Sequence, residues 1–229
     1  MNHINGLGRA VACTLSKTHF FDSYALLGRN KPAIFNTIHL MEKEAVGADI
    51  EYFEIDFAQP EKIPQLIEGV MKRFCNISCL LNIAGYTDPR SLLSTSLESF
   101  EYTYKVNVYS PFMLIKECTR HMKNSGGKIV NVASTAGMGP RPGWLSYASS
   151  KAAVISMSQT LTAELAEYGI KIYCVSPGRC ATKLRKRLAP EEDPATIMQP
   201  KDVAEVICKL VAPEEQCLDG QNIVIRKQV

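Results

Sequence analysis

The stretch Lys128-Ile-Val-Asn-Val132 is a short run rich in β-branched residues, and the segment 145–168 after it has the length and apolar spacing of an amphipathic helix. This change of period predicts a buried strand followed by a helix. Five further apolar runs alternate with helical patterns in the same way, at residues 24–27, 50–55, 79–81, 171–175 and 223–225. Alternating strands and helices predict a parallel sheet covered by helices on both faces.

The other helical patterns lie between these runs, at residues 63–74, 97–122 and 203–211, and several open on Ser, Asp or Pro, as helices commonly do. The stretch 179–199 has no clear pattern and contains three prolines when Pro200 is included, which predicts a surface loop or lid. A length of 229 residues is compatible with one α/β domain, so we expect residues 1–229 to form a single domain.

The composition is that of a globular chain. Hydrophobic residues make up 46% and charged residues 21%, which excludes a disordered or collagen-like polymer. The net charge is +3, from 26 basic and 23 acidic residues, and this slight excess does not point to a nucleic-acid or membrane surface. The expected partners are therefore small molecules or further copies of the chain.

The eight cysteines and four histidines lack the spacing of a zinc site, because no two cysteines form a Cys-x-x-Cys pair. We expect reduced thiols and no metal. No apolar run approaches the roughly 18 residues of a membrane span, and the first residues lack a basic segment followed by an apolar one. The expected compartment is the cytoplasm.

The segment Tyr147-Ala-Ser-Ser-Lys151 places a phenol and an ammonium four residues apart, on one face of the expected helix. The two side chains can therefore act on one atom. A free tyrosine titrates near pH ~10, but an adjacent cation and a helix N-terminus both favour the phenolate, which suits the pair to proton exchange nearer neutrality. Taken alone, this spacing also occurs on ordinary exposed helices.

Two more polar residues extend the pair. Ser134 stands thirteen residues before Tyr147, just past the strand predicted at 128–132, where side chains of a doubly wound sheet meet a ligand. Asn107 lies further upstream, in Lys105-Val-Asn-Val108. In order and spacing, these residues resemble the Asn, Ser, Tyr and Lys tetrad of the short-chain dehydrogenase/reductase family. The resemblance covers nearly the whole chain and includes Asn82-Ile-Ala-Gly85, with Ile83 in place of a second Asn, and Pro177-Gly178 with Thr182.

The resemblance implies a Rossmann-like, doubly wound α/β fold of three layers. It also implies an oxidoreductase that passes a hydride between a nicotinamide and a carbonyl or secondary alcohol. Tyr147 would exchange the hydroxyl proton, and Lys151 would lower the pKa of that tyrosine and hold the ribose. Ser134 would orient the substrate oxygen, and Asn107 would support a water relay. The implied cofactor residues are Gly6, Leu7, Gly8, Arg29, Asp56, Asn82, Ala84, Gly85, Tyr147, Lys151, Pro177, Gly178 and Thr182.

Each motif also has a plain structural interpretation. Ser134 can turn the chain, Asn107 can cap a helix, and Pro177-Gly178 can punctuate a loop. Asn82 can brace the sheet. The functional interpretation depends on the joint occurrence of these motifs in one order.

The segment Asn5-Gly-Leu-Gly-Arg-Ala10 leads into a helical pattern and matches the second and third glycines of the family's Gly-x-x-x-Gly-x-Gly turn. In that turn, backbone amides and a helix N-terminus meet the pyrophosphate. The first glycine falls at Asn2. In the family a strand of about five or six residues leads into the turn, and too few residues precede Gly6 for it. We therefore expect a truncated first strand and a gap between the inner strands at 24–27 and 79–81.

The segment Gly28-Arg-Asn-Lys31 lacks the acid that NAD-selective members place there for the ribose hydroxyls. Arg29 is suited to a 2′-phosphate, so NADP(H) is favoured over NAD(H), although an exposed basic turn would have the same sequence. Asp56 closes the run at 50–55 and matches the family position that contacts adenine. It is also a suitable helix cap.

The substrate is less readable. Four residues fall where family members line their pocket: Tyr86, Met138, Arg141 and Trp144. Such residues are as often ordinary packing or loop surface. The basic run 183–187 is expected to be a solvated helical face, with an anionic or carrier-bound substrate as the alternative. By analogy, the short lid resembles the lid of 3-oxoacyl-thioester reductases, and sugars, polyols and ketoacids stay open as substrates.

Two further expectations concern the whole protein. A catalytically impaired NADP-binding or scaffolding subunit is the rival function, because of the expected gap in the sheet. The helices predicted at 97–122 and 145–168 offer more surface than is needed to cover one face of the sheet. We therefore expect a homodimer or homotetramer.

Overall fold

Each of the six predicted apolar runs forms a strand in the computed structural model, which describes residues 6–227. In chain order the strands are β1 (Ser23–Gly28), β2 (Asp49–Glu54), β3 (Cys79–Asn82), β4 (Gly127–Val132), β5 (Ile170–Pro177) and β6 (Asn222–Ile225). Every pair of neighbouring strands is parallel. The strand prediction is confirmed.

The helices are α1 (Leu7–Ser16), α2 (Lys31–Glu42), α3 (Ile63–Phe74), α4 (Leu97–Tyr104), α5 (Ser110–Met122), α6 (Leu145–Leu165), α7 (Lys183–Leu188) and α8 (Pro200–Val211). One expectation needs correction. The helix predicted over 97–122 is divided by a π-helical turn, Lys105–Tyr109. Within the stretch 179–199 the basic run forms α7, and Thr182 caps this short helix by accepting a hydrogen bond from the amide of Arg185 over 3.1 Å.

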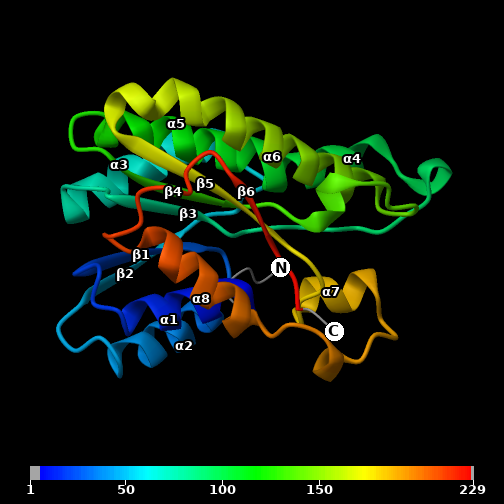
Figure 1. The fold of residues 1–229 in the computed structure, drawn as a ribbon, viewed down its shortest axis with the longest axis horizontal. Coiled ribbons are helices and arrows are strands. Elements are labelled where there is room, and N and C mark those ends of the chain that lie inside the picture. Colours follow the sequence, from blue (N-terminus) through cyan, green and yellow to red (C-terminus); the bar gives the residue numbers. More distant parts are fainter. Residues whose placement is uncertain (1–5, 228–229) are drawn as a thin grey trace.

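The helices cover both faces of the strands, in the three layers that the sequence predicts (Figure 1). α3, α5 and α6 lie on one face, and α1, α2 and α8 lie on the other (Figure 1). Because helices cover it from both sides, β5 is buried along almost its whole length. Within residues 6–227 no helix combines the length and hydropathy that a membrane crossing requires.

The strands form two sheets. β1 pairs with β2, and β3, β4, β5 and β6 form a second sheet in that order. Among residues 6–227 no strand lies between β1 and β3, and this is the place where the sequence predicts a gap. The expected truncation itself concerns residues 1–5, Asn2 included, which lie outside the described residues, so that expectation stays a prediction.

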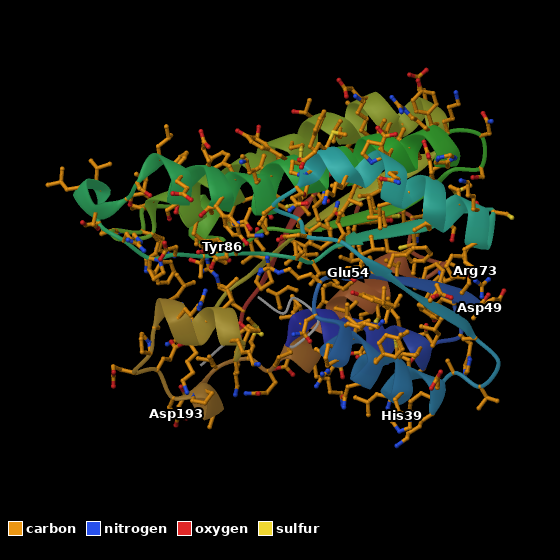
Figure 2. All side chains as sticks on the ribbon, turned by 180° about the vertical axis from the view of Figure 1, so that it is seen from behind. His39, Asp49, Glu54, Arg73, Tyr86 and Asp193 are labelled. Carbon is orange, nitrogen blue, oxygen red and sulfur yellow. The ribbon has the colours of Figure 1, made fainter. Side chains whose placement is uncertain are left out.

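Side-chain contacts show that the two sheets run in the same direction. At the amino ends, Arg73 in the last turn of α3, shortly before β3, pairs with Asp49 at the start of β2 (Figure 2). At the carboxyl ends, Tyr102 contacts both Arg29, which follows β1, and Tyr86, which follows β3. β1 and β3 therefore point the same way across the gap.

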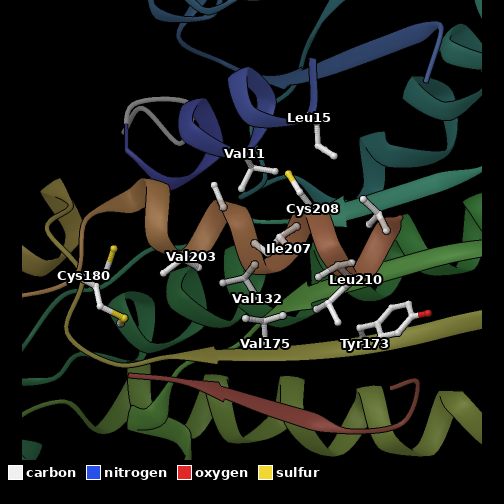
Figure 3. Packing of buried hydrophobic residues seen from close by; sticks show 14 residues of the cluster. Val11, Leu15, Val132, Tyr173, Val175, Cys180, Val203, Ile207, Cys208 and Leu210 are labelled. Atoms are coloured by element: carbon white, nitrogen blue, oxygen red, sulfur yellow. The ribbon is translucent and has the colours of Figure 1, made fainter. Parts of the chain in front are cut away.

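Two apolar clusters hold the layers together. One packs α1 and α8 against the second sheet and includes Val11, Val175 and Ile207 (Figure 3). The other packs α3 and α5 against the opposite face and includes Ile67 and Ile129. This packing fixes the carboxyl ends of β3, β4 and β5, where the polar residues singled out in the sequence lie.

Candidate active site

Ser134 and Tyr147 meet at the carboxyl end of β4. Ser134 begins a short 3-10 turn, Thr135–Met138, by accepting a hydrogen bond from the amide of Ala136 over 3.1 Å. Tyr147 lies in the first turn of α6, is 6% exposed, and lies close enough to Ser134 for the serine hydroxyl to influence its pKa. The two hydroxyls therefore form one polar pair within a largely buried surrounding.

Lys151 lies one helical turn after Tyr147 and is 3% exposed. Its Nζ atom donates to the carbonyl oxygen of Val132 over 2.7 Å and lies 5.9 Å from the centre of the Tyr147 ring. Val132 is the last residue of β4. The lysine therefore ties α6 to the end of the strand and holds its ammonium close to the phenol.

Burial dominates the electrostatics of these two residues. It raises the pKa of Tyr147, and the hydroxyl of Ser134 and the positive charge of Arg185 act against that rise. It lowers the pKa of Lys151 to about 8, against a smaller opposing effect of Cys174. In this structure the cation that favours the phenolate is Arg185, and the action of Lys151 on the phenol stays a prediction.

Asn107 is fully buried in the π-helical turn between α4 and α5. Its side-chain oxygen accepts from the amide of Tyr86 over 2.8 Å, and its side-chain nitrogen donates to the carbonyl oxygen of Tyr86 and the hydroxyl of Ser150, both over 2.9 Å. These bonds join the loop after β3 to α6. Single π-helical turns are frequent at functional sites, and this one sets the wall behind Tyr147.

A cavity of about 690 Å³ opens at this end of the sheet. Ser134, Tyr147 and Lys151 line it, and so do six of the predicted cofactor residues outside the tetrad: Leu7, Gly8, Gly85, Pro177, Gly178 and Thr182. Gly6 is not in the lining but lies beside Thr182. Segments far apart in the sequence thus meet in one place.

Three of the four residues expected near the pocket, Tyr86, Arg141 and Trp144, line the cavity. Met138 is not in the lining and is 48% exposed, which agrees with its alternative interpretation as loop surface. The ring of Tyr86 packs edge-on against Tyr102 with centres 4.7 Å apart, which fixes this wall.

α7 and its flanking residues bring four cations to the cavity: Arg179, Lys183, Arg185 and Arg187. The basic run forms a helix with Lys183, Lys186 and Arg187 exposed, as expected of a solvated helical face, and three of its cations also line the cavity. Arg185 contacts Glu192 at 2.5 and 2.8 Å and lies 5.7 Å over the ring of Trp144. Sequence reasoning did not single out Arg185 or Glu192. The only signal was that the basic run directly follows Thr182.

The glycines fit the passage of a nicotinamide dinucleotide along this edge. Gly6 caps α1 with a φ of 105°, a conformation that favours glycine, and a Cβ there would lie 3.6 Å from Thr182. A Cβ on Gly85 would lie 3.7 Å from Nζ of Lys151 and 3.8 Å from Oδ1 of Asn107. The N-terminus of α1 adds amides and a partial positive charge suited to phosphate.

Arg29 and Asp56 lie together but outside the lining of this cavity. Arg29 donates to Asp56 over 2.6 Å and to the hydroxyl of Tyr102 over 3.4 Å. Burial raises the pKa of Asp56, but the amide of Ala58 and the guanidinium of Arg29 outweigh it, so the pKa is lowered. The proposed phosphate ligand is thus already paired with the proposed adenine contact.

Asn82 has the bracing role that its structural interpretation predicts. Its side-chain nitrogen donates to Asn131 over 2.8 Å, and Asn131 donates to Ser158 over 3.0 Å, which links β3, β4 and α6. Asn82 Oδ1 is buried and has no hydrogen-bond partner among the described residues. Ala84 packs into the apolar cluster under α5 and not into the cavity lining.

Comparisons with known proteins agree with this geometry. Residues 3–193 match the family model described as short chain dehydrogenase. The chain is 30% identical over 226 residues to 3-oxoacyl-[acyl-carrier-protein] reductase of Synechocystis sp., covering 95% of this chain and 90% of that protein. It is 30% identical over 162 residues to L-fucose dehydrogenase of Mus musculus, covering 70% of this chain and 59% of that protein. The solved structure of ElxO with NADP bound matches with a TM-score of 0.86 at 24% identity, covering 98% of this chain and 94% of that chain.

The chain therefore belongs to the short-chain dehydrogenase/reductase family, with its Rossmann-like α/β fold. It is an NAD(P)-dependent oxidoreductase that acts on CH–OH groups.

Proposed function

We propose that the protein transfers a hydride between NADP(H) and a carbonyl or secondary alcohol, with Tyr147 as the group that exchanges the hydroxyl proton. The observation that supports this most is that Ser134, Tyr147 and Lys151 line one cavity at the carboxyl end of β4. The nicotinamide supplies or accepts the hydride when it is bound.

In the proposed mechanism the hydroxyls of Ser134 and Tyr147 both bind the substrate oxygen, which holds it in line for proton transfer. The proton moves between the phenolic oxygen and that oxygen. Lys151 in its charged form favours the phenolate, because an adjacent cation lowers the pKa of a buried phenol. Asn107 acts as a positioning residue, since its three bonds hold Tyr86 and Ser150 around the site.

The proposed cofactor contacts follow the edge of the sheet. Gly6, Leu7 and Gly8 would hold the pyrophosphate at the start of α1, and Gly85, Pro177, Gly178 and Thr182 would hold the nicotinamide half. Arg29 and Asp56 would contact the adenosine. Asn82 and Ala84 shape the strand end beneath.

The preference for NADP(H) rests on Arg29. Its guanidinium has further N–H donors beyond the one that binds Asp56, and these suit a 2′-phosphate. ElxO, one of the similar folds, was solved with NADP bound.

For the substrate we favour a 3-oxoacyl thioester. Arg141, Lys183 and Arg187 line the cavity, and no acidic side chain is in its lining among the described residues. Such a surface suits a substrate carried on an anionic group. The relative from Synechocystis is named for this class, while the mouse relative supports a sugar or polyol as the second candidate.

The test is a carbonyl panel. Oxidation of NADPH is followed with two substrates, an acetoacetyl thioester and a neutral ketone of similar size. L-fucose is tested in the reverse direction, by following the reduction of NADP. The proposal expects turnover of the thioester with the highest kcat/KM. Tight binding of NADPH with no turnover of any compound would instead support the rival function, a catalytically impaired NADP-binding or scaffolding subunit.

The remaining expectations belong to the same proposal: residues 1–229 act as one domain, in the cytoplasm, as a homodimer or homotetramer. Tyr109, the last residue of the π-helical turn, and Phe112 in the first turn of α5 are each 47% exposed and would be covered by a second copy. Sedimentation at micromolar concentration tests the assembly.

A further inference from the structure

Tyr102, in α4, contacts both the arginine proposed for the 2′-phosphate and a wall of the active-site cavity. Its hydroxyl accepts a hydrogen bond from Nη1 of Arg29 over 3.4 Å. Its ring packs edge-on against the ring of Tyr86, which lines the cavity, with centres 4.7 Å apart and an angle of 70° between the planes. Tyr102 itself is outside the cavity lining, so it can act on the site only through these two neighbours.

The hydroxyl of Tyr102 is suited to bind an anion beside Arg29. A phenol can accept and donate at once, and the oxygen of Tyr102 accepts from Arg29. Among residues 6–227 this hydroxyl donates no hydrogen bond, so its proton is available to a ligand. The Arg29 side chain is 34% exposed, which leaves the place beside both groups open to a cofactor.

The charge balance at Arg29 shows why a second donor is needed there. Arg29 donates to Asp56 over 2.6 Å, so the pair carries no net charge. The carboxylate of Asp56 also repels a second anion, which weakens the attraction that Arg29 alone offers to a phosphate. Tyr102 adds a neutral donor at the same place without adding charge. Hydrogen bonds to a charged phosphate oxygen are about twice as strong as those between neutral groups, so this donor favours a phosphate over a ribose hydroxyl.

The other contacts of Tyr86 lead to the helix that carries Tyr147. Asn107 bonds to the backbone N–H and C=O groups of Tyr86 over 2.8 and 2.9 Å, and to the hydroxyl of Ser150 over 2.9 Å. Ser150 in turn donates to the carbonyl oxygen of Tyr147 over 2.7 Å. Asn107 and Ser150 are fully buried. Direct contacts therefore run without a break from Tyr102 to the backbone of the residue proposed for proton exchange.

We propose that Tyr102 donates its phenolic proton to the 2′-phosphate of the cofactor beside Arg29 and, while held there, steadies Tyr86 in the wall of the cavity. This inference rests on the proposed function, because it takes Arg29 as the ligand of that phosphate. It adds a second phosphate ligand that the sequence motifs did not include. It also gives the phosphate an effect beyond affinity, since two sites that share one side chain are energetically coupled.

Calorimetric titration with two nucleotides tests the phosphate contact without reference to catalysis. The probes are adenosine 2′,5′-bisphosphate and adenosine 5′-monophosphate, which differ only in the 2′-phosphate. The unmodified protein should bind the bisphosphate at least about tenfold more tightly. Tyr102→Phe keeps the ring against Tyr86 and should lower this preference about fivefold or more, while affinity for the monophosphate stays within about twofold. Tyr104→Phe, on the same helix with its ring stacked on Phe100, is the matched control and should leave the preference unchanged.

Hydrogen exchange at the amide of Tyr86 tests the effect on the cavity wall. This amide donates to Asn107, so it exchanges only when the wall opens locally. In the unmodified protein, saturating bisphosphate should slow its exchange about threefold or more relative to saturating monophosphate. This difference does not depend on the folding of any variant. In Tyr102→Phe the two nucleotides should give the same rate, because the phosphate no longer holds the ring.

The outcomes separate this inference from the proposed function. Equal affinity of the unmodified protein for the two nucleotides would overturn both the inference and the choice of NADP(H). A clear preference for the bisphosphate that Tyr102→Phe leaves within about twofold would overturn the inference alone. Equal exchange of the Tyr86 amide with either nucleotide would also overturn it. A parallel loss of affinity for both nucleotides in Tyr102→Phe would contradict it too, because that pattern indicates a structural role for the hydroxyl.

Discussion

The Nζ atom of Lys151 donates a hydrogen bond to the carbonyl oxygen of Val132 over 2.7 Å at a position that is 3% exposed. This contact joins the helix that holds Tyr147 to the strand that precedes Ser134. Burial of the ammonium is unfavourable, which is why the pKa of Lys151 falls to about 8. The site therefore accepts a cost in stability to keep a cation beside the phenol.

Lys151→Met should reveal that cost through pH. The folded-state pKa of about 8 lies below the ordinary value of 10.5, so between these values the folded protein binds fewer protons than the unfolded chain. Stability then rises with pH, and the burial cost is present in full below pH 8. Urea unfolding from pH 7 to 10 should show the wild type gaining up to about 3 kcal/mol relative to Lys151→Met. A difference that does not change with pH would contradict the assignment.

Glu192→Gln should loosen the lid. Glu192 binds both Arg185 and Arg179, and the hydrogen bond from Arg185 lowers the pKa of this carboxyl. Without that charge Arg185 is no longer held over Trp144, so we expect KM for the carbonyl to rise about fivefold or more while kcat changes little. Glu191→Gln, at the exposed neighbouring position, is the control and should leave both constants unchanged. Equal effects of the two variants would show that the lid does not depend on the ion pair.

Arg29→Asp should reverse the choice of cofactor. It removes the donor proposed for the 2′-phosphate and places a carboxylate where that phosphate would lie. The ratio of kcat/KM with NADPH to that with NADH should fall by about a hundredfold or more. Lys43→Asp, an exposed cation just past α2, controls for net charge and should leave the ratio unchanged. Equal efficiency with both cofactors in the unmodified enzyme would remove the basis of the preference.

Gly85→Ala should weaken cofactor binding without unfolding the protein. The added Cβ would lie at ordinary contact distance from Lys151 and Asn107, 3.7 and 3.8 Å, so the fold tolerates it. It would nevertheless occupy the edge of the cavity, and we expect the Kd for NADPH to increase about tenfold. Gly139→Ala is the control, because nothing lies within 4 Å of a Cβ there. A large loss of thermal stability in Gly85→Ala would point to a packing role instead.

Local patterns in the sequence were sufficient to predict the strands and to place Ser134 near Tyr147. Ser134 and Tyr147 are fixed by β4 and the start of α6, elements with strong periodicity, so their meeting follows from the parallel topology. The pairing of Arg185 with Glu192 was not predictable, because it depends on how the lid folds back on itself. The π-helical turn at Asn107 was missed for a similar reason, since it preserves the apolar pattern of a continuous helix.

The partnering of Arg29 by Asp56 shows another limit of the sequence. Both residues were assigned to the cofactor separately. Only the pairing of β1 with β2 brings the guanidinium of Arg29 within 2.6 Å of the carboxylate of Asp56. Met138 could equally have lined the pocket or lain on the loop surface, and only the structure shows that it is exposed and outside the cavity lining. The hydrophobic periodicity of a sequence does not predict which way side chains point in short irregular turns.

Tyr147→Phe tests the central claim most directly. The substitution keeps the ring in its buried position and deletes the phenolic hydroxyl beside Ser134. Tyr168→Phe, at the more exposed end of the same helical segment, is the matched control. With NADPH and the best carbonyl of the panel, the account predicts that kcat falls by at least about a hundredfold in Tyr147→Phe while the Kd for NADPH stays within about twofold. Retention of kcat within about tenfold of the unmodified enzyme would contradict the assignment of Tyr147 as the proton-exchanging residue.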